Sequence, residues 1–158
     1  MSAVIKQDDI YVRPMSEEDL EFVMDVERHA YEFPWSKTIF HDCLHVGYCC
    51  WVLERNGIIV AHAVMSIAAG ESHILNLCVE PDYQSMGLGR SLLTHMLELA
   101  AEYNVTTSFL EVRPTNFSAI KLYLDMGFDE IGMRRNYYPA KMGREDALIF
   151  AKAVFKDK

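Results

Sequence analysis

The chain has 158 residues, of which 51% are hydrophobic and 24% charged, and its formal net charge is −8. A chain of this length is expected to form a single domain over residues 1–158 and to bury about 70% of the surface that its unfolded form exposes. The composition excludes disordered and fibrous classes. The acidic balance argues against a surface that binds nucleic-acid phosphates and favours a basic partner.

The cysteines and the apolar runs indicate in which cellular compartment the protein is expected. Cys43, Cys49, Cys50 and Cys78 form no C-x-x-C pair, and the adjacent Cys49 and Cys50 would point to opposite faces of a strand. We therefore expect reduced thiols in a cytoplasmic protein. The first nine residues lack the apolar stretch of a signal peptide, and the longest apolar run, 58–69, is interrupted by polar residues, so neither secretion nor a membrane span is expected.

Hydrophobic periodicity and turn residues predict alternating strands and helices without a linker or repeat. A helix with Leu20, Val23, Met24 and Tyr31 on one face is capped by Ser16, and Asn56-Gly57 predicts a hairpin. The predicted elements are a strand over 10–13, helices over 17–31 and 36–44, strands over 48–55, 58–69 and 72–79, a helix over 88–104, a strand over 107–112, a helix over 116–126, and strands over 128–133 and 146–155.

Three segments have a structural and a functional interpretation that the residues alone leave open. Glu27 lies on the apolar stripe of the first helix, where a carboxylate is more often bridged or solvated at the rim but can face a substrate amine. The segment from Phe33 to Trp35 is either a core plug or a substrate wall. Residues 134–145 form a polar and aromatic loop that is long enough to cover a cleft.

The segment from Gln84 to Arg90 is the most informative stretch, because it joins a predicted buried strand to an apolar-periodic helix. It contains Gly87 and Gly89 and no acidic residue. Backbone N–H groups at the start of a helix can hold a phosphate, although a tight turn alone would also need small residues. The spacing excludes a P-loop, and Leu92 occupies the third glycine position of the dinucleotide motif.

The pattern Q-x-x-G-x-G-R resembles the acetyl-CoA pyrophosphate loop of the GCN5-related N-acetyltransferases (GNAT). Further segments resemble the bacterial ribosomal-protein-alanine N-acetyltransferases of the RimI type within that superfamily. They are F-P-W-S at 33–36, L-E-V-R-P-T-N at 110–116, A-I-K-L-Y-L-D-M-G-F at 119–128, R-R-N-Y-Y-P at 134–139 and G-R-E-D-A at 143–147. The resemblance implies an α/β (α+β) fold whose mixed, mostly antiparallel sheet is flanked by helices on both faces.

The resemblance also implies the contacts with acetyl-CoA, the co-substrate, and it implies no metal. The cofactor-binding residues would be Leu77, Cys78, Val79, Ser85, Met86, Gly87, Leu88, Gly89, Arg90 and Asn116. A strand end such as 77–79 can pair with the pantetheine amides as a neighbouring strand would. Ser85 and Met86 stand where basic and polar residues are more usual in the family, so we expect weaker cofactor affinity at most.

In the family pattern Glu111 is the general base and Tyr123 the general acid. Glu111 is expected to project to the sheet face opposite Leu110 and Val112, and an ion pair with Arg113 or a helix lysine is the structural alternative. Tyr123 can protonate a leaving thiolate, or it is a core tyrosine. His62 and His73 are expected to be packed or hydrogen-bonded in strands and not catalytic.

The expected acceptor amine follows from the pKa values of the possible amines and from the family resemblance. Deprotonating a lysine amine costs about 3 kcal/mol more than deprotonating an α-amine. A single weak carboxylate base is therefore better suited to an α-amine. By resemblance the acceptor is the N-terminal alanine of small-subunit ribosomal protein eighteen, a basic partner. The substrate-binding residues would be Glu27, Phe33, Trp35, Tyr137 and Tyr138.

Other functions stay open at this point. They are an acetyltransferase for lysine side chains or for a small amine, and a catalytically silent acetyl-CoA-binding module. No nucleic acid or membrane partner is expected, and the protein is expected to be a monomer or a weak oligomer.

Overall fold

A computed structural model describes residues 9–156, so the first eight residues of the N-terminal segment considered above lie outside the described residues. The elements are β1 (Ile10–Pro14), the short 3-10 helix η1 (Glu17–Asp19), α1 (Leu20–Ala30), α2 (Lys37–His45), β2 (Cys49–Arg55), β3 (Ile58–Ala68), β4 (Glu71–Val79), η2 (Pro81–Tyr83), α3 (Leu88–Glu102), β5 (Thr107–Val112), α4 (Phe117–Asp125), β6 (Asp129–Pro139) and β7 (Arg144–Ala153). The predicted order of strands and helices is confirmed.

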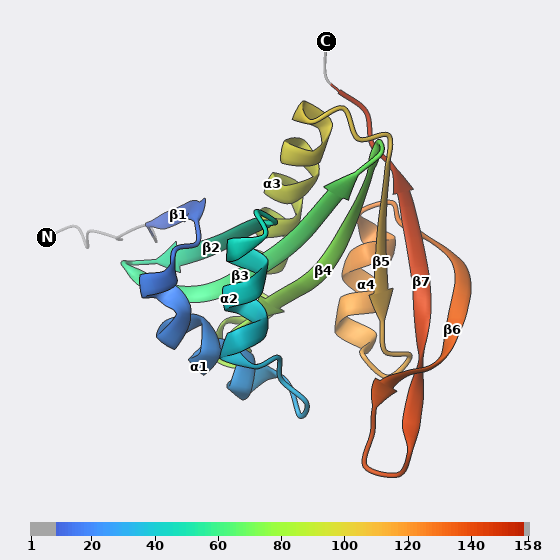
Figure 1. The fold of residues 1–158 in the computed structure, drawn as a ribbon, viewed down its shortest axis with the longest axis horizontal. Coiled ribbons are helices and arrows are strands. Elements are labelled where there is room, and N and C mark those ends of the chain that lie inside the picture. Colours follow the sequence, from blue (N-terminus) through green and yellow to red (C-terminus); the bar gives the residue numbers. More distant parts are fainter. Residues whose placement is uncertain (1–8, 157–158) are drawn as a thin grey trace, which may run out of the picture.

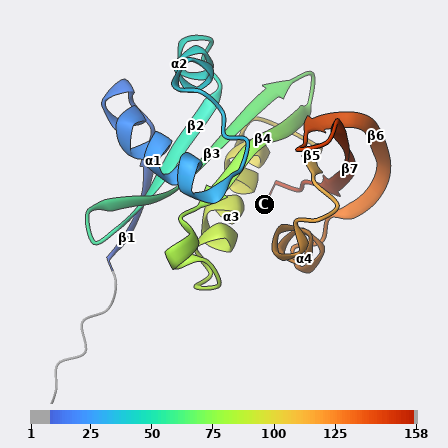
Figure 2. The same ribbon diagram turned by 90° about the horizontal axis from the view of Figure 1, so that it is seen from below.

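Within residues 9–156, seven strands form one mixed sheet in the order β1-β2-β3-β4-β5-β7-β6. Only the pairing of β4 with β5 is parallel among the described strands, and the other neighbours are antiparallel. Helices α1 and α2 cover one face of the sheet and α3 the other, while α4 lies beside the part formed by β5 and β7 (Figures 1 and 2). The predicted mixed, mostly antiparallel sheet with helices on both faces is therefore confirmed.

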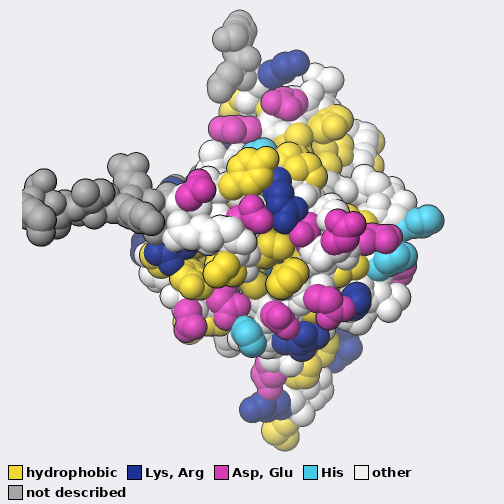
Figure 3. All heavy atoms as spheres, turned by 90° about the vertical axis from the view of Figure 1, so that its left-hand side faces the viewer, with side chains coloured by type: hydrophobic (Ala, Val, Ile, Leu, Met, Phe, Trp, Pro, Cys, Tyr) yellow, Lys and Arg dark blue, Asp and Glu magenta, His cyan; other side chains and the backbone are white. Residues whose placement is uncertain are grey.

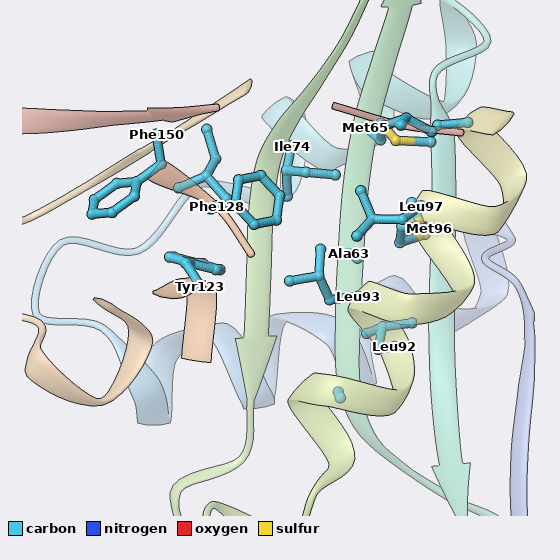
Figure 4. Close-up of a cluster of buried hydrophobic side chains, with 14 of the residues drawn as sticks. Ala63, Met65, Ile74, Leu92, Leu93, Met96, Leu97, Tyr123, Phe128 and Phe150 are labelled. Carbon is cyan, nitrogen blue, oxygen red and sulfur yellow. The ribbon is translucent and has the colours of Figure 1, made fainter. Parts of the chain in front are cut away.

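Each face of the sheet has its own buried cluster. Leu20, Val23 and Phe40 pack with residues of β2 and β3 beneath α1 and α2. The larger cluster joins the other face to α3 and α4, where Leu92, Leu93 and Met96 of α3 lie over Ala63 and Met65 and where Tyr123, Phe128 and Phe150 pack together (Figure 4). Cys50 belongs to the first cluster and Cys49 packs against the second, as expected for neighbours in a strand, and all four cysteines are free thiols.

The sheet splits where β4 and β5 part, and this split positions the site. The parallel pairing runs from Glu71 and Thr107 to Ile74 and Leu110 and then ends. A register shift in β4 at the same point lies opposite Val64 and Met65 of β3. Bulges of this kind bend a strand and leave a residue out of the ladder. The last residues of β4, up to Val79, consequently have a backbone edge that β5 does not cover.

Two local predictions were wrong. Tyr31 follows α1 with an extended backbone, φ −122° and ψ 138°, and so does not lie on the helix. The predicted loop over 134–145 is mostly strand, because β6 continues to Pro139 and β7 begins at Arg144. As the edge strand, β6 is exposed along almost its whole length, so it has no alternation of polar and apolar residues. Asn136, at φ 53°, lies within a register shift that interrupts its pairing.

Candidate active site

A cleft of about 1490 Å³ opens where β4 and β5 separate, and it extends from the N-terminus of α3 to the β6–β7 hairpin. It is lined by every site residue that the sequence predicted except Met86, whose side chain is exposed beside it. These residues come from α1, the segment after it, β4, the loop before α3, β5, α4 and β6. The fold thus brings the predicted cofactor, substrate and catalytic residues to one continuous surface.

The loop before α3 has the backbone geometry of an anion site. Ser85 and Gly87 have positive φ angles of 65° and 81°, and Gly87 is the N-cap of the 15-residue α3. The N–H groups of the first turn have no partner within a helix, and the helix dipole favours a negative group there. Arg90 adds a guanidinium at this end, 3.7 Å from the carboxylate of Asp125. These features can hold the phosphates of a nucleotide cofactor.

Gly89 serves a packing role in the same turn. A Cβ atom at this position would lie 3.4 Å from Cδ2 of Leu122 in α4 and 3.5 Å from Cγ2 of Val79 in β4. Both separations are ordinary van der Waals contacts, so a Cβ would fit, and a side chain larger than alanine would have to displace Leu122 or Val79. Gly89 thus leaves room for the first turn of α3 to lie against α4 and β4.

The uncovered edge of β4 forms the next part of the cleft. Tyr31 donates a 2.8 Å hydrogen bond from its hydroxyl to the carbonyl of Leu77, which fixes the strand at the centre of the site. Cys78 is buried on the α1 side, where its thiol donates a 3.9 Å hydrogen bond to the carbonyl of Val26. Burial raises the pKa of Cys78 well above its usual range, so this thiol is protonated and unreactive.

Glu111 extends from β5 immediately after the last residue paired with β4. Its side chain is only 6% exposed, and it projects away from the buried Leu110 and Val112 as predicted. Oε2 hydrogen-bonds Nε2 of His73 in β4, and Oε1 lies 3.2 Å from Nε of Arg134 in β6. Arg113 pairs with Glu145 instead, at 2.9 Å. The alternative of an ion pair between Glu111 and Arg113 or a helix lysine was therefore wrong.

Tyr123 lies on α4, where its ring packs in the core and the residue also lines the cleft. The ring centroid is 5.9 Å from that of Phe128 and 6.3 Å from that of Phe150, both visible beside it in Figure 4. Burial is the main cause that raises the pKa of Tyr123 far above its usual value, with a smaller contribution from Cys78. The hydroxyl therefore keeps its proton at neutral pH, as a proton donor requires.

Glu27 is not at the rim of α1, where the sequence favoured it, because the residue is only 1% exposed. Its Oε1 accepts hydrogen bonds from His62 Nε2 at 3.0 Å and from Asn76 Nδ2 at 3.1 Å. Its Oε2 accepts a 2.9 Å hydrogen bond from the backbone N–H of Trp35. The carboxylate therefore ties the segment after α1 to β3 and β4.

Aromatic side chains close the end of the cleft opposite the anion loop. Arg113 lies over the rings of Phe33 and Tyr138, 5.5 Å and 4.4 Å from their centroids. The rings of Tyr137 and Tyr138 meet edge to face at 4.8 Å. Burial raises the pKa of Tyr138 well above its usual value, so it is neutral and offers a hydroxyl and a ring face. This end of the cleft is therefore lined by aromatic rings stacked around one guanidinium.

Among the described residues, one group of buried side chains beside the cleft has metal-ligand chemistry. Glu27, His62 and Cys78 place one possible ligand atom each within 4.8 Å of one another, and all three are buried. Their atoms already make the hydrogen bonds described above, and Cys78 is protonated. Hydrogen bonding accounts for this cluster, and the expectation of no metal stays a prediction.

Sequence reasoning missed three residues of the site. Tyr31 was assigned to the helix face, His73 was expected only to be packed or hydrogen-bonded, and Arg134 had no assigned role. The partners of Glu111 are 38 and 23 residues away in the chain, on strands whose register no local pattern specifies.

The matching family places this site in a known class. The acetyltransferase (GNAT) family profile matches residues 12–128, and the chain belongs to that family. The curated [ribosomal protein bS18]-alanine N-acetyltransferase of Escherichia coli K12 is 41% identical over 136 residues, which cover 86% of this chain and 92% of that protein.

Solved structures agree with this assignment. The crystal structure of the ribosomal-protein-S18-alanine N-acetyltransferase from Escherichia coli superposes with a TM-score of 0.86 and 37% identity, over 95% of this chain and 97% of that one. The structure of Ard1 from Thermoplasma volcanium gives a TM-score of 0.85 and 26% identity, over 93% and 99% of the two chains. The resemblance to ribosomal-protein-alanine N-acetyltransferases and the fold expected from it are confirmed. No helix in the described part of the chain has the length and apolarity to cross a membrane.

Proposed function

We propose that this protein transfers the acetyl group of acetyl-CoA to the α-amine of the N-terminal alanine of a small-subunit ribosomal protein in the cytoplasm. The observation that carries the proposal is the single cleft, which joins an anion loop, an uncovered strand edge and an aromatic end. The curated Escherichia coli relative and the Escherichia coli crystal structure, each matching most of the chain, bear this activity in their names, with a bS18 or S18 acceptor.

The cofactor would lie along the cleft from α3 to Glu111. The N–H groups at Gly87 to Arg90 would hold the pyrophosphate, and Asn116 would add a contact beside it. The uncovered backbone of Leu77 to Val79 would pair with the pantetheine amides and bring the thioester to the split in the sheet. Ser85 and Met86 would contribute mainly backbone to this loop.

The reaction would proceed by direct attack of the amine on the thioester. Glu111, held on both oxygens by His73 and Arg134, would accept the proton of the amine. Tyr123, which burial keeps protonated, would donate its proton to the departing thiolate. Binding would hold the amine and the thioester next to each other in the orientation for attack, and this would supply much of the rate acceleration.

The acceptor would enter at the aromatic end. Tyr137, Tyr138 and Phe33 would flank an extended peptide, and Trp35, whose position Glu27 fixes, would form the other wall. On the face shown in Figure 3, acidic side chains are scattered among hydrophobic, basic and other side chains. The formal net charge of −8 favours a basic ribosomal tail.

A matched set of peptides tests the proposal. Each has an N-terminal Ala and an internal lysine, and one member is blocked at its α-amine; the acetyl position is read by tandem mass spectrometry. Acetylation confined to the free α-amine is expected. Equal acetylation of the blocked peptide would show a lysine acetyltransferase. If neither peptide reacts, a screen of small amines decides between the small-amine function and a silent acetyl-CoA-binding module.

A further inference from the structure

The net reaction of a protonated amine with acetyl-CoA releases one proton. The amine R–NH3⁺ loses two protons in forming R–NH–CO–CH3, and one of them is needed to form the thiol of CoA. The other must leave a site that cofactor and peptide fill from both ends. The proposed function therefore requires a route from Glu111 to solvent that neither substrate blocks.

A second cavity supplies such a route. It has a volume of about 380 Å³ and is lined by residues of β3, β4, β5, β6 and β7. Of the described residues that line this cavity or the main cleft, Glu111 alone lines both. The second cavity lies toward the β3–β4 turn, where Ser66, Ala68 and Glu71 contribute to its wall. It is thus separate from the predicted cofactor and peptide residues.

His73 connects Glu111 to this cavity. Its Nε2 hydrogen-bonds Oε2 of Glu111, whose side chain is 6% exposed, while the side chain of His73 is 31% exposed. The imidazole therefore touches the buried carboxylate through Nε2, and part of the same side chain is exposed to solvent. Arg134 holds the other carboxylate oxygen, so Glu111 presents a fixed face to His73.

We propose that His73 carries the released proton from Glu111 to water in the second cavity, a role that rests on the proposed function of Glu111 as the base. While Glu111 is a carboxylate, Nε2 of His73 donates a hydrogen bond to it and Nδ1 is unprotonated. After Glu111 takes the proton of the amine, proton exchange with water in the second cavity converts His73 to its Nδ1–H tautomer, and Nε2 then accepts the proton from Glu111. The resulting imidazolium gives its Nδ1 proton to water, which restores the carboxylate and the Nε2–H tautomer. The charged side chains that line the cavity with His73 are Glu111 from β5, Arg134 from β6 and Glu71 from its own strand.

Histidine suits this step because its two ring nitrogens can accept and release protons at neutral pH. Glutamine is the discriminating replacement: its amide can donate a hydrogen bond to Glu111, but it cannot carry a proton. Alanine leaves a space that opens into a cavity large enough to admit free imidazole. The two variants therefore separate proton transfer from simple positioning.

The experiment measures kcat and both KM values for His73→Gln and His73→Ala, with whichever peptide amine the wild-type enzyme acetylates. A relay predicts that both variants lose about 100-fold in kcat, the lower end of what proton-transfer groups supply, with both KM values unchanged. Imidazole should restore much of the rate of His73→Ala and little of that of His73→Gln. The control is His41→Ala, which removes an exposed histidine of α2 paired with Glu17 and should match the wild type.

Two results would overturn the relay. Near-wild-type kcat in His73→Gln would show that the histidine only positions Glu111, and failure of imidazole to raise the rate of His73→Ala would exclude transfer through this cavity. Acetylation of a lysine instead of an α-amine would contradict the proposed function but leave this test valid, since a lysine amine releases a proton in the same way.

Discussion

The backbone N–H of Trp35 donates a 2.9 Å hydrogen bond to Oε2 of Glu27, so a carboxylate that is 1% exposed fixes the segment that walls the cleft. The same carboxylate accepts from His62 and Asn76. One buried carboxylate therefore joins the segment that walls the cleft to β3 and β4.

Replacing Glu27 should show both effects. Glu27→Ala leaves three donors, two of them buried, without their acceptor, and we expect a loss of about 3 kcal/mol in the free energy of unfolding. Urea denaturation measures the loss, and the KM for the peptide should rise more than that for acetyl-CoA. The matched control on the same helix is Glu21→Ala, which breaks an exposed ion pair with Lys37 and should cost less than about 1 kcal/mol. Equal losses would contradict the structural role assigned to Glu27.

Gly87 allows a clean test of the anion loop. A side chain at φ 81° strains the backbone, so Gly87→Val should lose the thermal stabilisation by CoA, which for wild type is about 2.7 kcal/mol at a hundredfold excess over the dissociation constant. Gly57→Val introduces the same side chain at the same φ of 81° in the β2–β3 hairpin, away from the cleft. It should lower the melting temperature but keep the shift caused by CoA. Loss of the shift in both variants would remove the evidence for a phosphate site at Gly87.

Much of this site could be predicted because its signals are local. Gly87, Gly89 and the helical spacing after them specify a strand-to-helix loop within a few residues, and Asn56-Gly57 specifies a hairpin. The partners of Glu111 could not be predicted, since they depend on the register of β4 and β6 against β5 and β7. The extent of β6 was missed because an exposed edge strand lacks the alternation that a buried face imposes.

Glu111→Gln should slow the reaction at neutral pH, because the amide cannot accept the proton of the amine. We expect a fall of about 100-fold or more in kcat and a partial recovery as the pH approaches that at which the acceptor amine is already neutral. A pH–rate profile of wild type and variant measures both. If the ratio of the wild-type rate to the Glu111→Gln rate did not change with pH, Glu111 would be excluded as the base and would have a positioning role.

Tyr123→Phe should lower kcat by roughly 10²- to 10⁴-fold while leaving the affinity for acetyl-CoA nearly unchanged, since the hydroxyl acts only when the thiolate leaves. Because burial raises the pKa of Tyr123, the folded protein disfavours the ionised form. Below the usual tyrosine pKa near about 10, the side chain is protonated in both the folded and the unfolded protein, and this contribution to the free energy of unfolding is fully present. As the pH rises above about 10, the unfolded chain ionises first, and the contribution is lost. Wild type should therefore lose more stability above about pH 10 than Tyr123→Phe, as measured by urea denaturation. Unchanged turnover in the variant would identify a plain core tyrosine.

The peptide end of the cleft gives the last prediction, which concerns Tyr137 and Tyr138. Their rings meet at 4.8 Å, and Arg113 lies 4.4 Å from the centroid of Tyr138, so the pair is held as a fixed wall. Truncating both to Ala should raise the peptide KM about tenfold or more with little change in that for acetyl-CoA, since uniform binding energy is lost from one substrate only. The matched control is Tyr11→Ala, an exposed tyrosine of β1 outside the cleft, which should leave both KM values unchanged. If the double variant instead raised the KM for acetyl-CoA, the aromatic pair would belong to the cofactor end of the site, and the peptide would have to enter by another route.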